Sequence, residues 1–434
     1  MKKTITRTFL AIILCLFAYN FVNAQNTVED GQAYYKDKIF LKIKEEVGLR
    51  LPKFNNDQKV PNYPVLGSLI QPYKVKAVYR PFPKIKNSTF VNTYQVNIDP
   101  NSDIDELIAA LQSDPNVEYA EKIPIERLFF DPNDPAENAG EQWHLAAMDA
   151  SAAWDLSLGD EGVVVAVVDD AVRITHEDLT NSKWVNSGEI AGNGIDDDDN
   201  GYIDDINGWD AADNDNNPNP PSTATASAFS HGTHVAGLVG ATTNNNKGIA
   251  AIGGGVSIMA IKCTANNTSN SSIISHGWSG FQYALNNGAD VINMSWGGTG
   301  SSFTYQALIN AAYNAGITIV AAAGNSSTST QFYPAAYNNV IAVAATTNTN
   351  TKASYSNYGT WIDIAAPGSS LKSCVATNNT AYGYKSGTSM ASPVTAGLCA
   401  LLLSYEPTLT PSGILSCLSS TAVPVTGSTS VGAG

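Results

Sequence analysis

Cysteine and basic residues are scarce in this sequence. Its 434 residues include 5 cysteines, and 24 Lys and Arg stand against 39 Asp and Glu, which gives a net charge of −15. The cysteines and histidines have none of the spacings typical of a structural zinc site. A nucleic-acid partner requires a basic face, so the acidic balance argues against one.

Long apolar runs are also few. The run Phe9–Phe21 is short for a membrane span, follows a basic end and precedes Val22-Asn23-Ala24. This order is typical of a secretory signal with its cleavage site, so we predict a signal peptide over residues 1–24. No later run predicts a membrane span. We therefore expect a protein that is secreted or held at the cell surface.

The few cysteines leave disulfide pairing open. Cys15 lies in the predicted signal, where lipidation is an alternative that the bulky Leu14 disfavours. Four cysteines follow the signal: Cys263, Cys374, Cys399 and Cys417. In an exported protein they can form two disulfides in three connectivities, and the sequence does not choose among them.

Charge is unevenly distributed along the chain. Residues 1–130 carry 17 Lys and Arg against 14 Asp and Glu, whereas residues 131–434 carry 7 against 25. Bound cations, or attraction to an oppositely charged pro-segment, would offset the negative charge of the second part. The length and the 43% of hydrophobic residues allow two or more domains with a large core.

Residues 25–130 have the pattern of a small α+β domain. Alternating apolar residues predict three strands: Ile39–Val47, Thr93–Ile98 and Val117–Ala120. Ser102–Gln112 is predicted as a helix with Ser102 as its N-cap. A linker of turn residues starts at Asp131, so we predict a second domain over residues 131–434.

Strands alternate with helices in this second part. Continuous apolar runs predict five strands: Val163–Val168, Ile258–Ile261, Val291–Met294, Ile317–Ala323 and Val340–Ala345. Helical patterns fall between and after them: His234–Thr242, Ser275–Asn286, Tyr305–Asn314 and Val394–Tyr405. Strands without polar alternation are buried on both faces, which indicates a parallel sheet covered by helices. Sites in such sheets form at the carboxyl ends of the strands.

Three polar clusters occupy positions suited to such a site. Asp169 follows an apolar strand directly, and His231 opens a helix rich in small residues. Ser389 lies just before an apolar helix, where Pro393 fits a first turn and free amides favour negative charge. Taken singly, each cluster also has a structural explanation as a turn or a helix start.

The three clusters together resemble the motifs of subtilisin-like serine proteases. They read VAVVDDAV, HGTHVAG and GTSMASP, in the family's order of aspartate, histidine and serine. The resemblance covers roughly residues 140–434, with a weaker similarity to the family's pro-domain over 116–121. It implies an α/β fold, with a mostly parallel sheet flanked by helices on both faces and preceded by a small α+β pro-domain.

The resemblance also implies the catalytic roles. Ser389 would be the nucleophile, His231 the general base and then acid, and Asp169 the group that orients His231. Asn325 matches the family's oxyanion-hole asparagine, whose amide would act together with the Ser389 backbone amide. The other histidines, His144, His176, His234 and His276, we interpret as structural, with His234 facing the interior.

Two further segments match the family's substrate-binding elements. They contain Ser295, Trp296, Gly297 and Gly298, together with Ala323 and Gly324. The glycines would let a peptide backbone approach as an added strand, and both segments would wall the primary specificity pocket. No acidic residue lies near Gly297 or Gly324 in the sequence to favour basic side chains in the substrate. We therefore expect a broad preference for apolar or aromatic substrate side chains.

Two adjacent positions depart from the family pattern. Ser or Thr and then Gly usually follow the catalytic aspartate, whereas Asp170 and Ala171 stand here. A neighbouring carboxylate is found in the kexin-like branch, although HGTHVAG is more similar to the subtilisin branch. Alanine resists backbone conformations that glycine permits, and we expect activity to survive the change.

An acidic segment matches the template of a calcium loop. Its side chains at loop positions one, three, five and nine are acids or an amide, glycine is sixth, and the seventh residue offers a carbonyl. The predicted ligands are Asp196, Asp198, Asn200, Tyr202 and Asp204. A solvated acidic loop is the alternative, but so many adjacent carboxylates are costly without a counter-ion.

These observations predict a secreted serine endopeptidase made as a zymogen, with calcium as a structural cofactor. Its partners would be polypeptide substrates and its own pro-domain, and we expect a monomer without a nucleic-acid partner. The alternative is a catalytically inactive, calcium-stabilised binding module. An esterase is disfavoured because Ser389 lacks the Gly-x-Ser-x-Gly pattern. Since the family usually continues into a final helix, we also expect a sequence truncated at its C-terminus.

Overall fold

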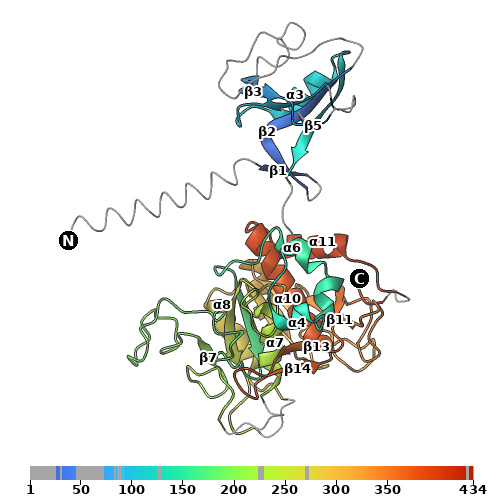
Figure 1. The fold of residues 1–434 in the computed structure, drawn as a ribbon. Helices are drawn as coiled ribbons and strands as arrows, with labels where there is room; N and C mark the ends of the chain where they lie inside the picture. The colour runs from blue at the N-terminus through green and yellow to red at the C-terminus, as the bar shows by residue number, and fades with distance from the viewer. Residues whose placement is uncertain are drawn as a thin grey trace, which may run out of the picture. The chain divides into compact units, whose positions relative to one another are not determined.

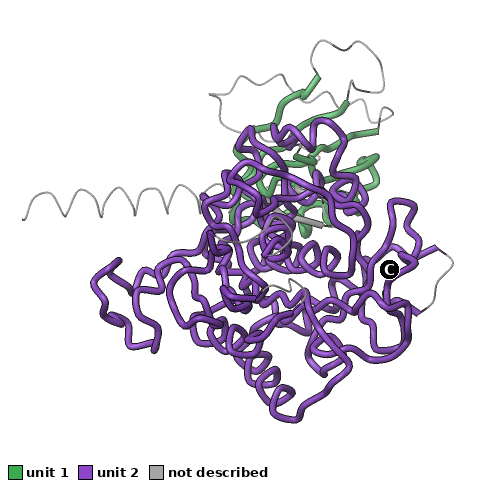
Figure 2. The backbone as a smooth tube through the Cα atoms, turned by 90° about the horizontal axis from the view of Figure 1, so that it is seen from below, with its two compact units in different colours: residues 1–128 green, residues 129–434 purple. Residues whose placement is uncertain are grey.

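The chain forms two compact units, residues 1–128 and 129–434 (Figure 2). The computed structural model describes residues 26–29, 32–44, 73–82, 85, 90, 92–125, 130–222, 229–268, 273–426 and 430–433. The predicted signal over 1–24 lies outside the described residues, as does the end of the strand predicted over Ile39–Val47.

Unit 1 is an antiparallel sheet with one helix. Its elements are β1 (Asn26–Glu29), β2 (Gln32–Ile43), β3 (Ala77–Tyr79), β4 (Thr93–Asn97), α3 (Ile104–Gln112) and β5 (Val117–Pro124). The order is β1-β2-β4-β3, and β5 also pairs with β2. Alternate residues of β2, such as Ile39 and Leu41, pack with Leu107 and Leu111 of α3 in a small core.

The N-cap of α3 differs from the prediction. Asp103, not Ser102, is the cap, and its carboxylate accepts hydrogen bonds from the amides of Asp105 and Glu106. Ser102 Oγ instead donates to the carbonyl of Tyr73 over 3.0 Å. Both side chains suit a helix start, and the tertiary contact to Tyr73 decides between them.

Unit 2 is built on a seven-stranded parallel sheet (Figure 1). The strand order is β12-β11-β10-β9-β6-β8-β7. Their bounds are β6 (Val164–Asp169), β7 (Gly208–Asp210), β8 (Ser257–Lys262), β9 (Val291–Met294), β10 (Thr318–Ala322), β11 (Ile341–Thr346) and β12 (Ile364–Pro367). The five strands predicted from apolar runs are all present, and the predicted α/β fold is confirmed. Two strands were not predicted: β7 has only three residues, and β12 is half alanine and ends in proline.

The remaining elements of unit 2 are mostly helices. They are α4 (Pro135–Asn138), α5 (Trp143–Ala147), α6 (Ala150–Trp154), α7 (His231–Gly240), α8 (Gly277–Asn286), α9 (Phe303–Asn314), α10 (Thr388–Tyr405), α11 (Pro411–Thr421) and the paired strands β13 (Leu371–Cys374) and β14 (Tyr382–Lys385). The helix predicted over His234–Thr242 begins one turn earlier, at His231.

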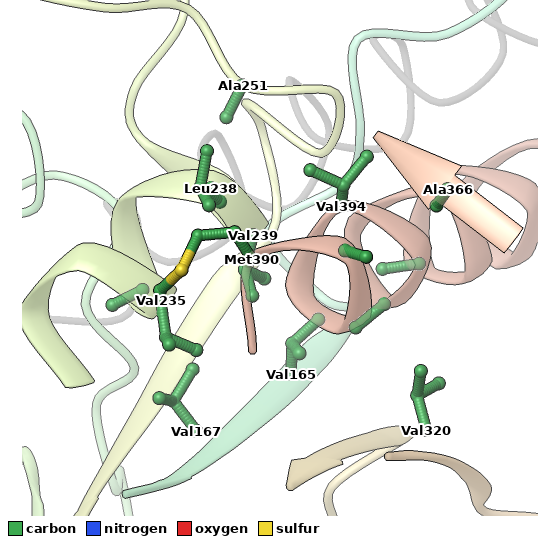
Figure 3. Packing of buried hydrophobic residues seen from close by; sticks show 14 of the residues in the cluster. Val165, Val167, Val235, Leu238, Val239, Ala251, Val320, Ala366, Met390 and Val394 are labelled. Carbon is green, nitrogen blue, oxygen red and sulfur yellow. The ribbon is translucent and has the colours of Figure 1, made fainter. Parts of the chain in front are cut away.

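Helices cover both faces of this sheet. Alternate residues of β6 separate the two cores: Val165 and Val167 pack with α7, α10 and α11, whereas Ala166 and Val168 pack with α8 and α9. Figure 3 shows the first core, in which Val165 and Val167 lie near Val235 of α7 and Met390 and Val394 of α10. Burial on both faces explains why these strands are apolar throughout.

Helix α10 passes through the centre of the first core. By length and composition it could cross a membrane, contrary to the expectation that no later run could, but 72% of it is buried inside the protein. Pro393 lies inside the helix rather than in its first turn as predicted. A proline there removes the amide that would bond the Ser389 carbonyl. Ser295 Oγ replaces it, donating to that carbonyl over 3.0 Å.

The strand order places a crevice at the carboxyl end of β6. β7 and β8 lie on one side of this strand and β9 to β12 lie on the other, so the direction in which the chain adds strands reverses at β6. A reversal of strand order in a parallel sheet leaves a crevice at the carboxyl ends of the strands, where ligands bind. Asp169 ends β6, and Ser295 directly follows β9.

Candidate active site

A cleft of about 800 Å³ lies at this edge of the sheet. It is lined by nearly all of the residues predicted for catalysis and substrate binding: Asp169, His231, Ser295, Trp296, Gly297, Gly298, Gly324, Asn325 and Ser389. Ala323 is the exception, because its side chain is fully buried in the second core. Residues far apart in the sequence thus meet in one cavity of unit 2.

Asp169 and His231 are joined by a direct hydrogen bond. His231 Nδ1 lies 2.8 Å from Asp169 Oδ1, and the aspartate is fully buried whereas the imidazole is 31% exposed. Burial lowers the pKa of His231, but the Asp169 carboxylate and its hydrogen bond outweigh burial and raise this pKa above its ordinary value of 6.5. The buried carboxylate therefore favours the tautomer with the proton on Nδ1, which leaves Nε2 free to accept a proton.

Ser389 is the second residue of α10, and its hydroxyl is hydrogen-bonded elsewhere. Ser389 Oγ donates to the Ser295 carbonyl over 3.0 Å. In the described part of the chain no hydrogen bond joins Ser389 to His231. The structure therefore brings the three predicted catalytic residues into one cleft but places the serine hydroxyl in a rotamer bonded to Ser295.

Asn325 lies next to the start of α10. Its Oδ1 accepts hydrogen bonds from Thr388 N at 2.8 Å and Thr388 Oγ1 at 3.0 Å. Because the oxygen is occupied, the Nδ2 group is the end available to a ligand. Gly387, with φ of +156°, completes this junction: a Cβ there would lie 3.3 Å from Asn325 Nδ2 in a conformation that side chains rarely adopt.

The predicted substrate-binding strand is only partly free. Gly298 exchanges two backbone hydrogen bonds with Tyr333, at 2.8 and 2.7 Å, so its backbone is already paired. Trp296 Nε1 donates to the Val168 carbonyl over 2.8 Å, which holds the indole against the end of β6. An added strand would therefore have to pair with the backbone before Gly298.

The two residues after Asp169 fit without strain. Ala171 is fully buried and does not have a positive φ, so the backbone there does not require the glycine usual in the family. Asp170 is 1% exposed and also lines the cleft. The departure from the family pattern is therefore a change of side chain with no special backbone conformation.

Several residues of the cleft were not singled out from the sequence as site residues. They include Ser230, Ile273, Ile274, Trp278, Phe332, Tyr333, Lys385 and Thr388. Lys385 Nζ donates to Ser230 Oγ over 3.2 Å. The positions of Ser230 and Thr388, directly beside His231 and Ser389, were the available signal. Trp278 comes from α8, Lys385 from β14 and the rest from loops, and no local pattern reveals how these segments pack.

The histidines outside the cleft are mostly interior. His234 is fully buried, as predicted, and its Nε2 lies 3.1 Å from the Leu371 carbonyl. Burial lowers the pKa of His144 to about 4 and, with the positive charge of Lys385, lowers that of His234 to about 3. All four cysteines after the predicted signal are unpaired: Cys263, Cys374, Cys399 and Cys417.

The acidic loop gathers a different set of carboxylates from the one predicted. Oxygen atoms of Glu189, Asp198 and Asp205 lie within 4.8 Å of one another. Only Asp198 belongs to the five predicted ligands. The carboxylate oxygens are hard donors of the kind calcium prefers, so this group fits such an ion.

The other predicted ligands form hydrogen bonds within the loop. Asp196 and Asp204 accept backbone N–H groups of neighbouring loop residues. Asn200 Oδ1 accepts the amide of Tyr202 over 2.7 Å, and the Tyr202 ring packs against Trp209. Sequence spacing did not reveal that Glu189 and Asp205 lie beside Asp198, because that proximity depends on how the loop folds back.

Comparisons with known proteins agree with this geometry. Residues 160–434 match the profile described as the Subtilase family. The chain is 34% identical over 385 residues to the thermophilic serine proteinase of Bacillus sp. (strain AK1), covering 88% of this chain and 82% of that protein. Thermitase of Thermoactinomyces vulgaris is 37% identical over 279 residues, covering 63% of this chain and 86% of thermitase.

Two further relatives extend the comparison. The extracellular protease of Xanthomonas campestris is 38% identical over 352 residues, which cover 76% of this chain but 59% of that protein. A solved protease structure from Pseudoalteromonas arctica has a TM-score of 0.55 and 31% identity, covering 70% of this chain and 96% of that one. The chain belongs to the subtilase family. It is accordingly a serine-type endopeptidase with the α/β fold of that family.

Proposed function

We propose that this protein is a secreted endopeptidase, made as a zymogen, that cleaves peptide bonds through Asp169, His231 and Ser389. The observation that carries the proposal is the 2.8 Å hydrogen bond between His231 Nδ1 and the buried Asp169, in the cleft that Ser389 also lines. An inactive binding module on the same fold is not favoured, because the relatives matched over most of the chain are named as proteases.

The first chemical step uses His231 as a base. A serine hydroxyl is a weak nucleophile at neutral pH and needs an adjacent base to remove its proton. Ser389 Oγ leaves the Ser295 carbonyl, turns toward His231 and attacks the substrate carbonyl while Nε2 takes its proton. His231 then gives this proton to the departing amine, leaving an acyl-enzyme that water hydrolyses with His231 again as base. Asp169 stabilises the imidazolium formed in each step.

Two donors would stabilise the oxyanion. The Ser389 amide belongs to the first turn of α10, where amide groups have no partner within the helix. Asn325 Nδ2 is the second donor, because Thr388 holds the oxygen end of that side chain. Donors held in place in this way are effective because they need not reorganise as charge develops.

Peptide substrates would bind along the backbone before Gly298 and beside Gly324. Both segments line the cleft with Ser389. Ile273, Ile274 and Trp278 also line it, and no acidic side chain other than Asp169 and Asp170 does. We infer a preference for apolar or aromatic side chains in the substrate.

The proposal includes processing of the chain. Unit 1 would be the pro-domain, released near residues 128–136 after export, and the protein would be a monomer. Export is supported by relatives that are named as extracellular proteases.

The proposal also includes a calcium ion. Glu189, Asp198 and Asp205 would hold this ion, which would cross-link the acidic loop. Its contribution would be structural, by neutralising adjacent carboxylates.

The test is Ser389→Ala, with Ser386→Ala as a matched control. Ser386 is an exposed serine three residues away. Ser389→Ala should lose labelling by a fluorophosphonate probe, lose peptide hydrolysis and remain unprocessed at the end of unit 1. The control variant should be labelled by the probe, hydrolyse the peptide and be processed at the end of unit 1. Unchanged hydrolysis in Ser389→Ala, or a wild-type protein that the probe does not label, would refute the proposal.

A further inference from the structure

We propose that Asp170 is a positioning residue of this active site, whose buried carboxylate fixes the backbone of His231 against the end of β6. The proposal rests on the function proposed above and extends it to Asp170, which stands where the family usually has Ser or Thr. It concerns how the imidazole is held, and not a new chemical step.

The contacts of Asp170 join two segments that are distant in the sequence. Oδ2 accepts the amide of His231 over 3.0 Å, and Oδ1 accepts the amide of Gly232 over 2.7 Å. Oδ1 also accepts the amide of Ala171 over 2.7 Å. The carboxylate is 1% exposed, so little water competes for these bonds. Asp170 therefore caps α7 from a different element.

Within the described residues, α7 has no side-chain cap of its own. Ser230, at the N-cap position, makes no capping hydrogen bond with its side chain. The first amides of a helix lack partners within the helix, and leaving buried ones unpaired is costly. Asp170 satisfies the first two of them. Its negative charge also suits the positive end of the helix dipole.

The two segments approach so closely that only glycine fits beside His231. A Cβ on Gly232 would lie 2.6 Å from the Ala171 carbonyl oxygen and 2.8 Å from Asp169 Cβ. At the next residue of α7, Thr233 Oγ1 accepts the amide of Arg173 over 3.0 Å. The start of α7 is thus bound to the end of β6 at successive residues, and the two Asp170 contacts involve His231 itself and its neighbour.

Charge gives Asp170 a second effect on His231. The ionisable groups near Asp170 are Asp169, His231 and the Cys263 thiol after β8, and Lys385 of β14 also acts on His231, lowering its pKa. Burial and Asp169 raise the pKa of Asp170 to about 6, so at pH 7 the carboxylate is mostly ionised. The ionised carboxylate adds to the effect of Asp169 in raising the pKa of His231. It would therefore stabilise the imidazolium that forms during catalysis.

The test compares Asp170→Ser and Asp170→Ala in the full chain. Both remove the charge, whereas only serine keeps an oxygen that can accept a backbone amide. Asp170→Ala should lower kcat about tenfold with KM within about twofold, and Asp170→Ser should lower kcat less. Loss of the charge should move the acidic limb of the kcat/KM profile to lower pH in both variants, because Asp170 contributes to raising the pKa of His231.

Asp290→Asn is the matched control. Asp290 is a partly buried carboxylate that accepts the Val164 amide over 2.8 Å, at the opposite end of β6. The Asp290→Asn variant should have a lower melting temperature, but the acidic limb of its kcat/KM profile should not move. An unmoved acidic limb in both Asp170 variants, or failure of both to fold while Asp290→Asn folds, would reduce Asp170 to a structural residue and overturn the inference.

The fluorophosphonate probe separates this failure from failure of the proposed function. If wild-type Ser389 is labelled and the Asp170 variants have wild-type pH profiles, only the positioning role is wrong. If wild-type protein is not labelled, the proposed triad is wrong and the positioning role falls with it.

Discussion

Ser295 and Ser389 exchange two hydrogen bonds, each 3.0 Å long. Ser295 Oγ donates to the Ser389 carbonyl, and Ser389 Oγ donates to the Ser295 carbonyl. Ser295 Oγ in turn accepts from Asn293 Nδ2 over 3.0 Å. The first turn of α10 is thereby fixed to the end of β9. The pairing is possible because Pro393 supplies no amide to the Ser389 carbonyl.

This pairing predicts the effect of Ser295→Ala. The substitution removes the partner of the Ser389 carbonyl and of the Asn293 side-chain Nδ2 group. The free energy of unfolding should therefore fall by about 1–3 kcal/mol. Adding Pro393→Ala supplies a backbone amide one turn ahead, so the double variant should lose less than the sum of the single losses. Denaturant unfolding in the Ser389→Ala background measures both. Strictly additive losses would contradict the explanation.

The oxyanion donor predicts a loss of kcat in Asn325→Ala. The expected decrease is roughly 100- to 1000-fold, a magnitude carried over from subtilisin, where the equivalent donor was removed. KM for a peptide substrate should change little, because the donor acts mainly in the transition state. Steady-state kinetics measure both constants. A rise in KM of similar size with kcat unchanged would contradict the assignment.

Thr388 predicts a smaller effect of the same kind. Its hydroxyl donates to Asn325 Oδ1 over 3.0 Å and accepts the Gly324 amide over 3.0 Å. Thr388→Val keeps the shape but leaves the Asn325 side chain less firmly oriented, so kcat should fall about tenfold with folding intact. Combined with Asn325→Ala, the second substitution should add little. A full additional tenfold loss in the double variant would show that Thr388 acts independently.

Buried neutral histidine predicts acid sensitivity. His144 is 2% exposed, and burial lowers its pKa from the ordinary 6.5 to about 4. Because the unfolded chain takes up the proton first, the free energy of unfolding should fall as the pH drops below about 6.5 and should level off near 4. At pH 5 this group accounts for about 2 kcal/mol. His144→Gln in the Ser389→Ala background should lessen the loss between pH 7 and pH 5 by that amount, which denaturant unfolding measures.

The carboxylate group in the acidic loop predicts a response to chelation. Removing calcium should lower the melting temperature of the wild type, because Glu189, Asp198 and Asp205 would then repel one another. Glu189→Gln and Asp205→Asn should weaken that response, whereas Asp196→Asn, outside the group, should keep it. Thermal unfolding with and without a chelator gives the comparison. Equal melting temperatures in the wild type would eliminate the site.

Local patterns identified most of the fold because burial leaves a clear mark. The run Val163–Val168 has no polar residue, as a strand buried on both faces requires, and β6 occupies nearly the same residues. The three-residue strand β7 has no such mark, since its pairing with β8 depends on the chain around it. The cap of α3 was misassigned because Ser102 and Asp103 both suit the position, and the contact of Ser102 with Tyr73 is not local.

The sequence by itself determined the family, the sheet and the residues that converge on the cleft. The chemistry requires fixed residue types, the fold of this family places them in a fixed order along the chain, and both are visible in the sequence. The tertiary structure alone decided which carboxylates share the acidic loop, which carbonyl accepts the Ser389 hydroxyl, and that Asp170 caps the helix of His231. These relationships join residues that are not neighbours in the sequence, and the distance between such residues is set by how the chain folds and packs rather than by any local pattern.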